Sequence, residues 1–273
     1  LTLLRGLDVL DELLLGLALS ENDRGLPVAL RLLNRAQPLE DTVVRQSELL
    51  RERVKELECL RAIARLFDMQ DSSGAFGAWG PSNTDIWLTS YVTDFLTRAR
   101  EAGYTVRDLP FRQALDRIQN FALNTDQVKD GGEERAYALY ILARNGRAPV
   151  GELRYEVDTR LDRFKTPLAK AQLGAALAMV GDKERAERAF GAALGALDAQ
   201  KDLNVARQDY GSDVRDGAAL LTLASEARIV RTETPRLVNV VSRAYASRAY
   251  TSTQEQAWML LAAHALGDEA KGA

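Results

Sequence analysis

A single cysteine and a single histidine limit the chemistry that this chain can perform. Cys59 alone cannot close an internal disulfide or supply the thiolates of a zinc or iron–sulfur site. His264 alone excludes sites built from several histidines, so a Ser-His-Asp or Cys-His catalytic site would have to use it. Both residues lie in segments with helical periodicity. We expect Cys59 to be a small buried residue with an unactivated thiol, and His264 to be a core side chain bonded to the backbone.

The densest group of polar candidates lies in DYGSDVRD at 209–216. Its carboxylates could in principle act as general acids or bases. Because Arg215 stands among three aspartates, we favour a hydrogen-bonded knot that fixes the start of a helix, with Ser212 or Asp213 as the N-cap. The candidate interaction or structural residues in this stretch are Tyr210, Asp213, Arg215 and Asp216.

Large aromatic residues surround a glycine-rich turn, SSGAFGAWGPSN at 72–83. Phe76, Trp79 and Trp87 could stack on a ligand, or they could anchor the turn to the core. We favour the second interpretation, because the glycines allow the tight backbone that would press Phe76 and Trp79 inward. On that interpretation both side chains are buried, and Trp79→Ala costs about 3–5 kcal/mol of stability.

The segments that hold these residues are predicted to be helices. Apolar residues recur at three- and four-residue spacing almost throughout, and glycine, proline and asparagine punctuate the breaks. We therefore predict an all-α fold in which short helices stack as hairpins, either in an open solenoid or in a closed ring. Twelve helices are predicted, at 8–19, 27–35, 40–68, 84–102, 109–122, 133–144, 150–163, 167–180, 183–197, 212–227, 234–248 and 252–266.

The choice between solenoid and ring depends on internal repeats. MVGDKERAERAFGAAL at 179–194 looks like one tetratricopeptide helix pair, but no second copy follows at the offset of about 34 residues that such modules show. The last predicted helix is as apolar as the middle ones, which favours a ring without exposed ends. The ring is the prediction, and the solenoid is the alternative.

Composition excludes several classes of function. The chain has 273 residues with 46% hydrophobic content, enough for a sizeable core, and its 36 basic and 39 acidic residues leave a net charge of -3 without a basic face for nucleic acid. The longest apolar stretch, near 13–19, is far shorter than the roughly 18 residues of a membrane span. The first residues lack the pattern of a signal peptide, so we expect a fragment of a larger protein.

One segment carries a resemblance to a known family: DMQDSSGAFGAWGPSNTDIWLTSYVTDFLTRAREAGYTV at 68–106. This segment resembles the thioester domain of bacterial α2-macroglobulins, where a glycine- and aromatic-rich turn precedes W-L-T-x-Y-V-x-D-F-L. The stretches at 209–221 and 252–263 are similar to the same family, whereas 1–60 match poorly. The resemblance implies one α/α toroid of about six helical hairpins over 1–273, in agreement with the twelve helices counted from periodicity.

The same resemblance implies a function. Members of the family are built from many β-sandwich macroglobulin domains, are usually lipid-anchored in the periplasm, and change shape when a proteinase cuts their bait region. It implies neighbouring macroglobulin domains and target proteinases as partners, and no cofactor, metal, nucleic acid or membrane contact for this segment. We expect a non-catalytic domain that packs against its neighbours and helps to close the trap.

The residues that would form the thioester are missing. Thioester-bearing members carry Cys-x-Glu-Gln, whereas Cys59 is followed by Leu60, Arg61 and Ala62. The Glu255-Gln256 pair lies far away in sequence, and LEDT at 39–42 is the nearest candidate for a decayed motif. The spacing from 39–42 to the glycine-rich turn is shorter than the resemblance implies, so a thioester segment absent from this sequence is the open alternative.

Enzymes form the alternative class of function, because similar toroids house terpene cyclases, prenyltransferase subunits and carbohydrate-active enzymes. The chain lacks the DxDD and DDxxD motifs of the cyclases, and one cysteine with one histidine is too few for a prenyltransferase zinc site. A carbohydrate-active enzyme or ligand-binding module stays open, because the separation of paired carboxylates cannot be read from sequence.

Overall fold

The computed structural model describes residues 53–124, 131–199 and 209–271, together with positions 45 and 48. The chain divides into two compact units, Leu1–Ala62 and Ile63–Ala273. The helices predicted at 8–19 and 27–35, and the LEDT sequence at 39–42, lie outside the described residues.

The prediction of an all-helical fold is confirmed. Residues 53–67 are helical, and the described part of the chain after them forms further α-helices and two short 3-10 helices without a β-strand. Each helix that the periodicity predicts in this part of the chain is present. The α-helices are α3 (Ile86–Glu101), α4 (Asp108–Asn124), α5 (Glu133–Arg144), α6 (Val150–Thr159), α7 (Pro167–Met179), α8 (Lys183–Ala199), α9 (Asp213–Ala227), α10 (Thr234–Ala246) and α11 (Thr253–Lys271), with 3-10 helices η1 (Leu161–Arg163) and η2 (Arg231–Glu233).

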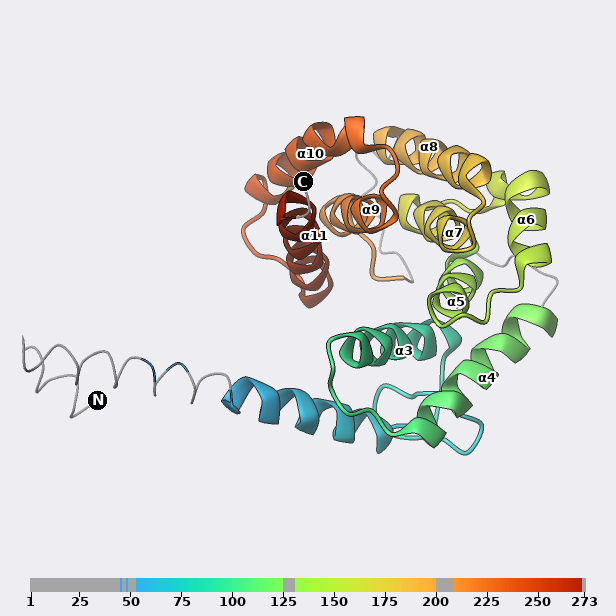
Figure 1. Cartoon of the computed structure of the whole chain (residues 1–273), viewed down its shortest axis with the longest axis vertical. Coiled ribbons are helices and arrows are strands. Elements are labelled where there is room, and N and C mark those ends of the chain that lie inside the picture. Colours follow the sequence, from blue (N-terminus) through green and yellow to red (C-terminus); the bar gives the residue numbers. More distant parts are fainter. Residues whose placement is uncertain (1–44, 46–47, 49–52, 125–130, 200–208, 272–273) are drawn as a thin grey trace, which may run out of the picture. The chain divides into compact units, whose positions relative to one another are not determined.

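The helices of the Ile63–Ala273 unit form two layers. Helices α3, α5, α7, α9 and α11 pack against one another in chain order and form an inner layer, while α4, α6, α8 and α10 lie outside them (Figure 1). Each outer helix packs against one or both of the inner helices that it connects. Consecutive helices therefore pair as α/α hairpins.

Composition fits the positions of α7 and α10. Helix α7 is rich in alanine and leucine on every side, and nearly all of its side chains are buried, whereas α10 has apolar residues on one face and buries only Leu237. A helix that is apolar all round must be covered on all sides. Helices α7 and α8 also approach each other closely at Gly174 of α7. A Cβ added there would lie 2.8 Å from the ring of Phe190 on α8.

Side-chain caps fix the start of four inner helices. Asp85, Thr166 and Ser212 accept hydrogen bonds from backbone N–H groups in the first turns of α3, α7 and α9. Helix α11 begins with a capping box, in which Glu255 N–H donates to Ser252 Oγ (3.2 Å) and Ser252 N–H donates to Glu255 Oε2 (2.7 Å). These caps fix the residue at which each of these four helices begins and the preceding loop ends.

Two predictions for single side chains were wrong. His264 is a surface residue with its side chain 75% exposed, and its Nδ1 lies 3.1 Å from Asp268 Oδ2. It lies on the side of α11 away from Trp258 and Ala262, which form the buried face. Cys59 is partly exposed, because the helix at 53–67 leaves most of its side chains open to solvent around it.

The turn before α3 contains a glycine at which any side chain would be strained. Gly74 has φ +90°, and a Cβ added there would lie 2.3 Å from the backbone oxygen of Gln113. We expect Gly74→Ala to lower the free energy of unfolding by at least about 2 kcal/mol in urea denaturation, since both the backbone conformation and the packing oppose it. Gly191→Ala is the control, because open space surrounds that helical position and alanine there should stabilise by up to about 1 kcal/mol. Equal effects of the two substitutions would contradict this account of the turn.

Candidate functional site

The turn at 70–84 is held rigidly by its own side chains. The Asp71 carboxylate accepts hydrogen bonds from the backbone N–H groups of Ser73 (2.8 Å) and Ala75 (3.0 Å). Gln70 Nε2 donates to the carbonyl oxygen of Pro110 on α4 (2.9 Å), which ties the turn to the outer layer. Burial raises the pKa of Asp71, but these N–H groups and the hydroxyl of Ser73 outweigh it and hold the pKa below its ordinary value.

The two aromatic residues of the turn, Phe76 and Trp79, differ in their burial. Phe76 is fully buried, as predicted, and its backbone N–H donates to the hydroxyl of Thr89 on α3 (3.0 Å). The prediction that Trp79 is also buried was wrong, because its side chain is 98% exposed. Isolated bridges pair Gln70 with Phe76 and Gly77 with Thr84, so the tip that carries Trp79 projects from the anchored base. Trp79 therefore contributes little to the stability of this unit.

An aromatic cluster joins α3, α5 and the loop before α9. Trp87 stacks on Tyr91 with ring centroids 5.5 Å apart and planes 6° apart, and Tyr137 meets Trp87 edge-on at 6.2 Å. Tyr210 lies 5.4 Å from Trp87 and keeps 69% of its surface exposed. Burial raises the pKa of Tyr91, and this outweighs the opposite effect of a hydrogen bond with Gln254 of α11. The cluster thus places Trp87 and Tyr210 together.

Arg215 forms the knot that the sequence predicts at the start of α9. Its side chain is 1% exposed, and it pairs with the carboxylates of Asp209 (2.7 Å) and Asp216. Burial opposes the charged guanidinium, but the two aspartates outweigh that cost and raise the pKa of Arg215. Ser212 is the N-cap, as one of the two proposed alternatives, and Tyr210 beside the knot has the unusual φ of +55°. The knot therefore holds Tyr210 in a backbone conformation that tyrosine rarely adopts.

Asp213 belongs to a second group, which links α9 to α11. Its carboxylate pairs with Arg248, which also lies 2.9 Å from Glu255 Oε1. Glu255 is 3% exposed and accepts a hydrogen bond from the hydroxyl of Ser212 (2.6 Å). The caps of α9 and α11 are therefore joined directly.

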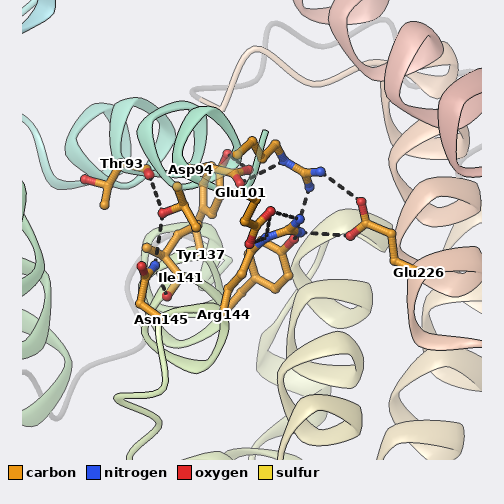
Figure 2. A network of polar contacts seen from close by, with 11 residues as sticks. Thr93, Asp94, Glu101, Tyr137, Ile141, Arg144, Asn145 and Glu226 are labelled. Atoms are coloured by element: carbon orange, nitrogen blue, oxygen red, sulfur yellow. Dashed lines mark hydrogen bonds and ion pairs between the residues drawn. The ribbon is translucent and has the colours of Figure 1, made fainter. Parts of the chain in front are cut away.

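The largest polar network lies between α3, α5 and α9 (Figure 2). Glu226 of α9 accepts from Arg98 of α3 and from Arg144 of α5, each at 2.8 Å. The hydroxyl oxygen of Tyr140 also accepts from both arginines, at 3.1 and 2.7 Å.

The remaining members of this network hold the two arginines in place. Asp94 accepts from Arg98 Nε (3.0 Å) and from the hydroxyl of Tyr137 (3.0 Å). Glu101 pairs with Arg144 at 2.7 Å. Both arginines lie near the carboxyl ends of their helices, where positive charge complements the helix dipole.

The charges of this network act on one another. Burial alone would raise the pKa of Glu226, but Arg98 and Arg144 outweigh this effect and lower it from its ordinary value of 4.5. Burial likewise opposes ionised arginine, but Asp94, Tyr140 and Glu226 raise the pKa of Arg98. Glu226 and Arg98 are therefore held in the ionised forms that pair with each other.

The carboxylates buried in the described residues share one environment. Each is paired with an arginine: Asp94 with Arg98, Glu156 with Arg135, Asp209 and Asp216 with Arg215, and Glu255 with Arg248. A carboxylate held against an arginine in this way is suited to a structural role, because the charge-assisted contact fixes its position. Among the same residues, no group of three or more His, Cys, Asp or Glu side chains could hold a metal ion.

Sequence reasoning found the Arg215 knot but missed the network around Glu226. The local signals for it were two pairs, each spaced four residues apart on one helix, Asp94 with Arg98 and Tyr140 with Arg144. The contacts of Arg98 and Arg144 with Glu226 join residues 128 and 82 positions apart, which no local pattern reveals.

Fold and site define a helical domain of α/α hairpins, whose polar clusters join the helices of its inner layer. No family model matches the sequence. The α2-macroglobulin of Escherichia coli K12 is 34% identical over 216 residues, which cover 76% of this chain and 13% of that protein.

Solved structures agree with this match. The crystal structure of native E. coli α2-macroglobulin spanning domain MG7 to the C-terminus has a TM-score of 0.67 at 32% identity, covering 76% of this chain and 34% of that one. Salmonella α2-macroglobulin reacted with methylamine has a TM-score of 0.66 at 32% identity, covering 74% and 14%. The chain is a homologue of the bacterial α2-macroglobulins, and it spans about an eighth of the length of the E. coli relative.

None of the described helices has the length and apolar composition needed to cross a bilayer.

The Glu226 network gives a prediction about pH. Glu226→Gln should lower the free energy of unfolding by about 1–3 kcal/mol at pH 7, the usual range for hydrogen bonds to charged groups. Because the folded pKa is lowered, the wild-type advantage is complete well above pH 4.5 and is lost as the pH falls through 4.5 toward the folded pKa. Urea denaturation at several pH values measures this difference. Asp198→Asn, at an exposed pair with Arg236, is the control and should cost less than about 1 kcal/mol. A Glu226→Gln effect that stays constant from pH 7 to pH 3 would refute the assignment.

A second prediction concerns Arg215. Arg215→Met leaves Asp209 and Asp216 buried without their guanidinium, so we expect a loss of about 3–5 kcal/mol in chemical denaturation. Arg188→Met removes a guanidinium that is 49% exposed and should cost less than about 1 kcal/mol. Similar losses for the two variants would show that the knot does not stabilise α9.

Proposed function

We propose that this chain is the non-catalytic, thioester-lacking helical domain of a bacterial α2-macroglobulin-like proteinase-trapping protein. Its role is to pack against neighbouring macroglobulin domains and to help close the trap around a proteinase without covalent chemistry. The observation that carries the proposal is the homology to α2-macroglobulins in a chain whose one cysteine lacks an acyl partner. Target proteinases and the neighbouring domains are the proposed partners, and the periplasm is the proposed location.

Internal thioester chemistry needs a cysteine sulfur and a glutamine side-chain carbonyl one helical turn apart. Cys59 lies on the helix at 53–67, where Ala62 occupies the position three residues later. The Glu255-Gln256 pair lies far from Cys59 in sequence, and Gln256 Nε2 donates to the hydroxyl of Thr251 (3.0 Å). Glu255 serves the capping box and pairs with Ser212 and Arg248. These assignments support a domain that acts through contacts.

The pairing of the buried carboxylates with arginine also weighs against a carbohydrate-active enzyme. Glycosidases need one carboxylic acid with a raised pKa beside a second carboxylate. Here Asp209 and Asp216 both pair with the guanidinium of the buried Arg215. This arrangement suits a structural knot better than an acid–base pair.

The proposal predicts a chain without an internal thioester. The intact mass should equal the sequence mass, and incubation with methylamine should leave it unchanged, because no strained acyl group is present to react. Salmonella α2-macroglobulin, whose structure was solved after reaction with methylamine, is the matched control for the reagent. Loss of one ammonia from the expected mass, or a methylamine adduct, would sink the proposal.

A further inference from the structure

Trp79 combines an exposed side chain with a fixed backbone. Its indole is 98% exposed, more than any other large apolar side chain in the described residues, and the turn that carries it is fixed. Leaving the indole exposed forgoes the free energy that burying so large an apolar side chain would give. A residue placed in this way is suited to contact with a partner, and tryptophan is among the residues that contribute most to protein interfaces.

The turn is already ordered before any partner binds. Asp71 and Gln70 fix its base, and the buried Phe76 anchors its middle, as described above. At the tip, a Cβ added to Gly77 would lie 2.1 Å from the carbonyl oxygen of Gly80 and 2.4 Å from that of Ser82, so the backbone folds tightly on itself. A fixed tip loses little conformational entropy on binding, so more of the free energy of burying the indole remains.

The chemistry of the tip identifies the kind of partner. Residues 77–83 read GAWGPSN and carry no charge. Nucleic acid and anionic lipid surfaces are bound through lysine and arginine, which this tip lacks. An uncharged tip with one large aromatic side chain fits an apolar pocket on a folded protein domain.

Homology indicates where that domain comes from. The E. coli relative is a chain of which this sequence matches only 13%, and its solved segment includes a further named domain, MG7. We propose that Trp79 docks into an apolar pocket of an adjacent domain of the same parent chain. This inference rests on the proposed function, because it requires a multidomain parent.

Hydroxyl-radical footprinting with mass spectrometry tests the docking. The rate of oxidation of Trp79 is measured in the 273-residue chain and in the full-length parent chain, with Tyr250, which is 87% exposed, as the internal reference. We expect Trp79 to react at least about tenfold more slowly in the parent chain, because the core of an interface excludes water. Equal rates in the two chains would overturn the proposal, as would protection that appears only when phosphatidylserine vesicles are added.

Substitution gives the second readout. In the 273-residue chain, Trp79→Ala should leave the melting temperature within about a degree, since exposed side chains contribute little to stability. In the parent chain, the same substitution should raise the rate of trypsin cleavage between the helical unit and its neighbours by about 30-fold, which corresponds to a hot spot of about 2 kcal/mol. Trp79→Phe should retain part of the protection. Unchanged cleavage in the parent chain would refute docking, whereas failure of the proposed function would appear separately as loss of ammonia from the intact mass.

Discussion

Pairing between buried arginine and carboxylate is the interaction on which this helical unit depends. Arg215 is almost completely buried, and the two aspartates beside it make that burial tolerable. A buried charge without a partner costs several kcal/mol, so each guanidinium dictates where its carboxylates must lie. Arg98 and Arg144 act in the same way on Glu226, and thereby place α9 against α3 and α5. The apolar helices supply the stabilising area, while these pairs specify which helices meet and in which register.

The same pairing limits the chemistry of the unit. A carboxylate that pairs with a buried arginine is fixed in place by that contact, so it serves the fold rather than a reaction. The surface, in contrast, carries aromatic side chains in fixed positions. Tyr210 is held against Trp87 by a strained backbone next to the Arg215 knot, and Trp79 stands at the end of a rigid turn. Fixed aromatic groups on a scaffold with occupied carboxylates support the proposal of a domain that works by contact.

Much of the fold could be predicted from the sequence because its signals are local. Helix periodicity, glycine and proline at the breaks, and caps such as Ser212 each depend on a few neighbouring residues. The Arg215 knot was also predictable, since its aspartates lie within six positions. The Glu226 network was not, because its partners come from three helices far apart in the chain. Trp79 and His264 were placed wrongly for a related reason: an apolar or aromatic neighbourhood in sequence does not say which side of a turn or helix faces the core.

The central claim, that this domain serves a proteinase trap through contacts alone, is tested most directly on the full-length parent chain after cleavage by trypsin. The digest is boiled in SDS with a reducing agent and separated on a gel, and trypsin is detected with an antibody. A non-covalent trap predicts that all trypsin migrates at its own mass after boiling, although it remains associated with the parent chain before denaturation. Trypsin found in a band that survives boiling and contains the peptide of this domain would contradict the account.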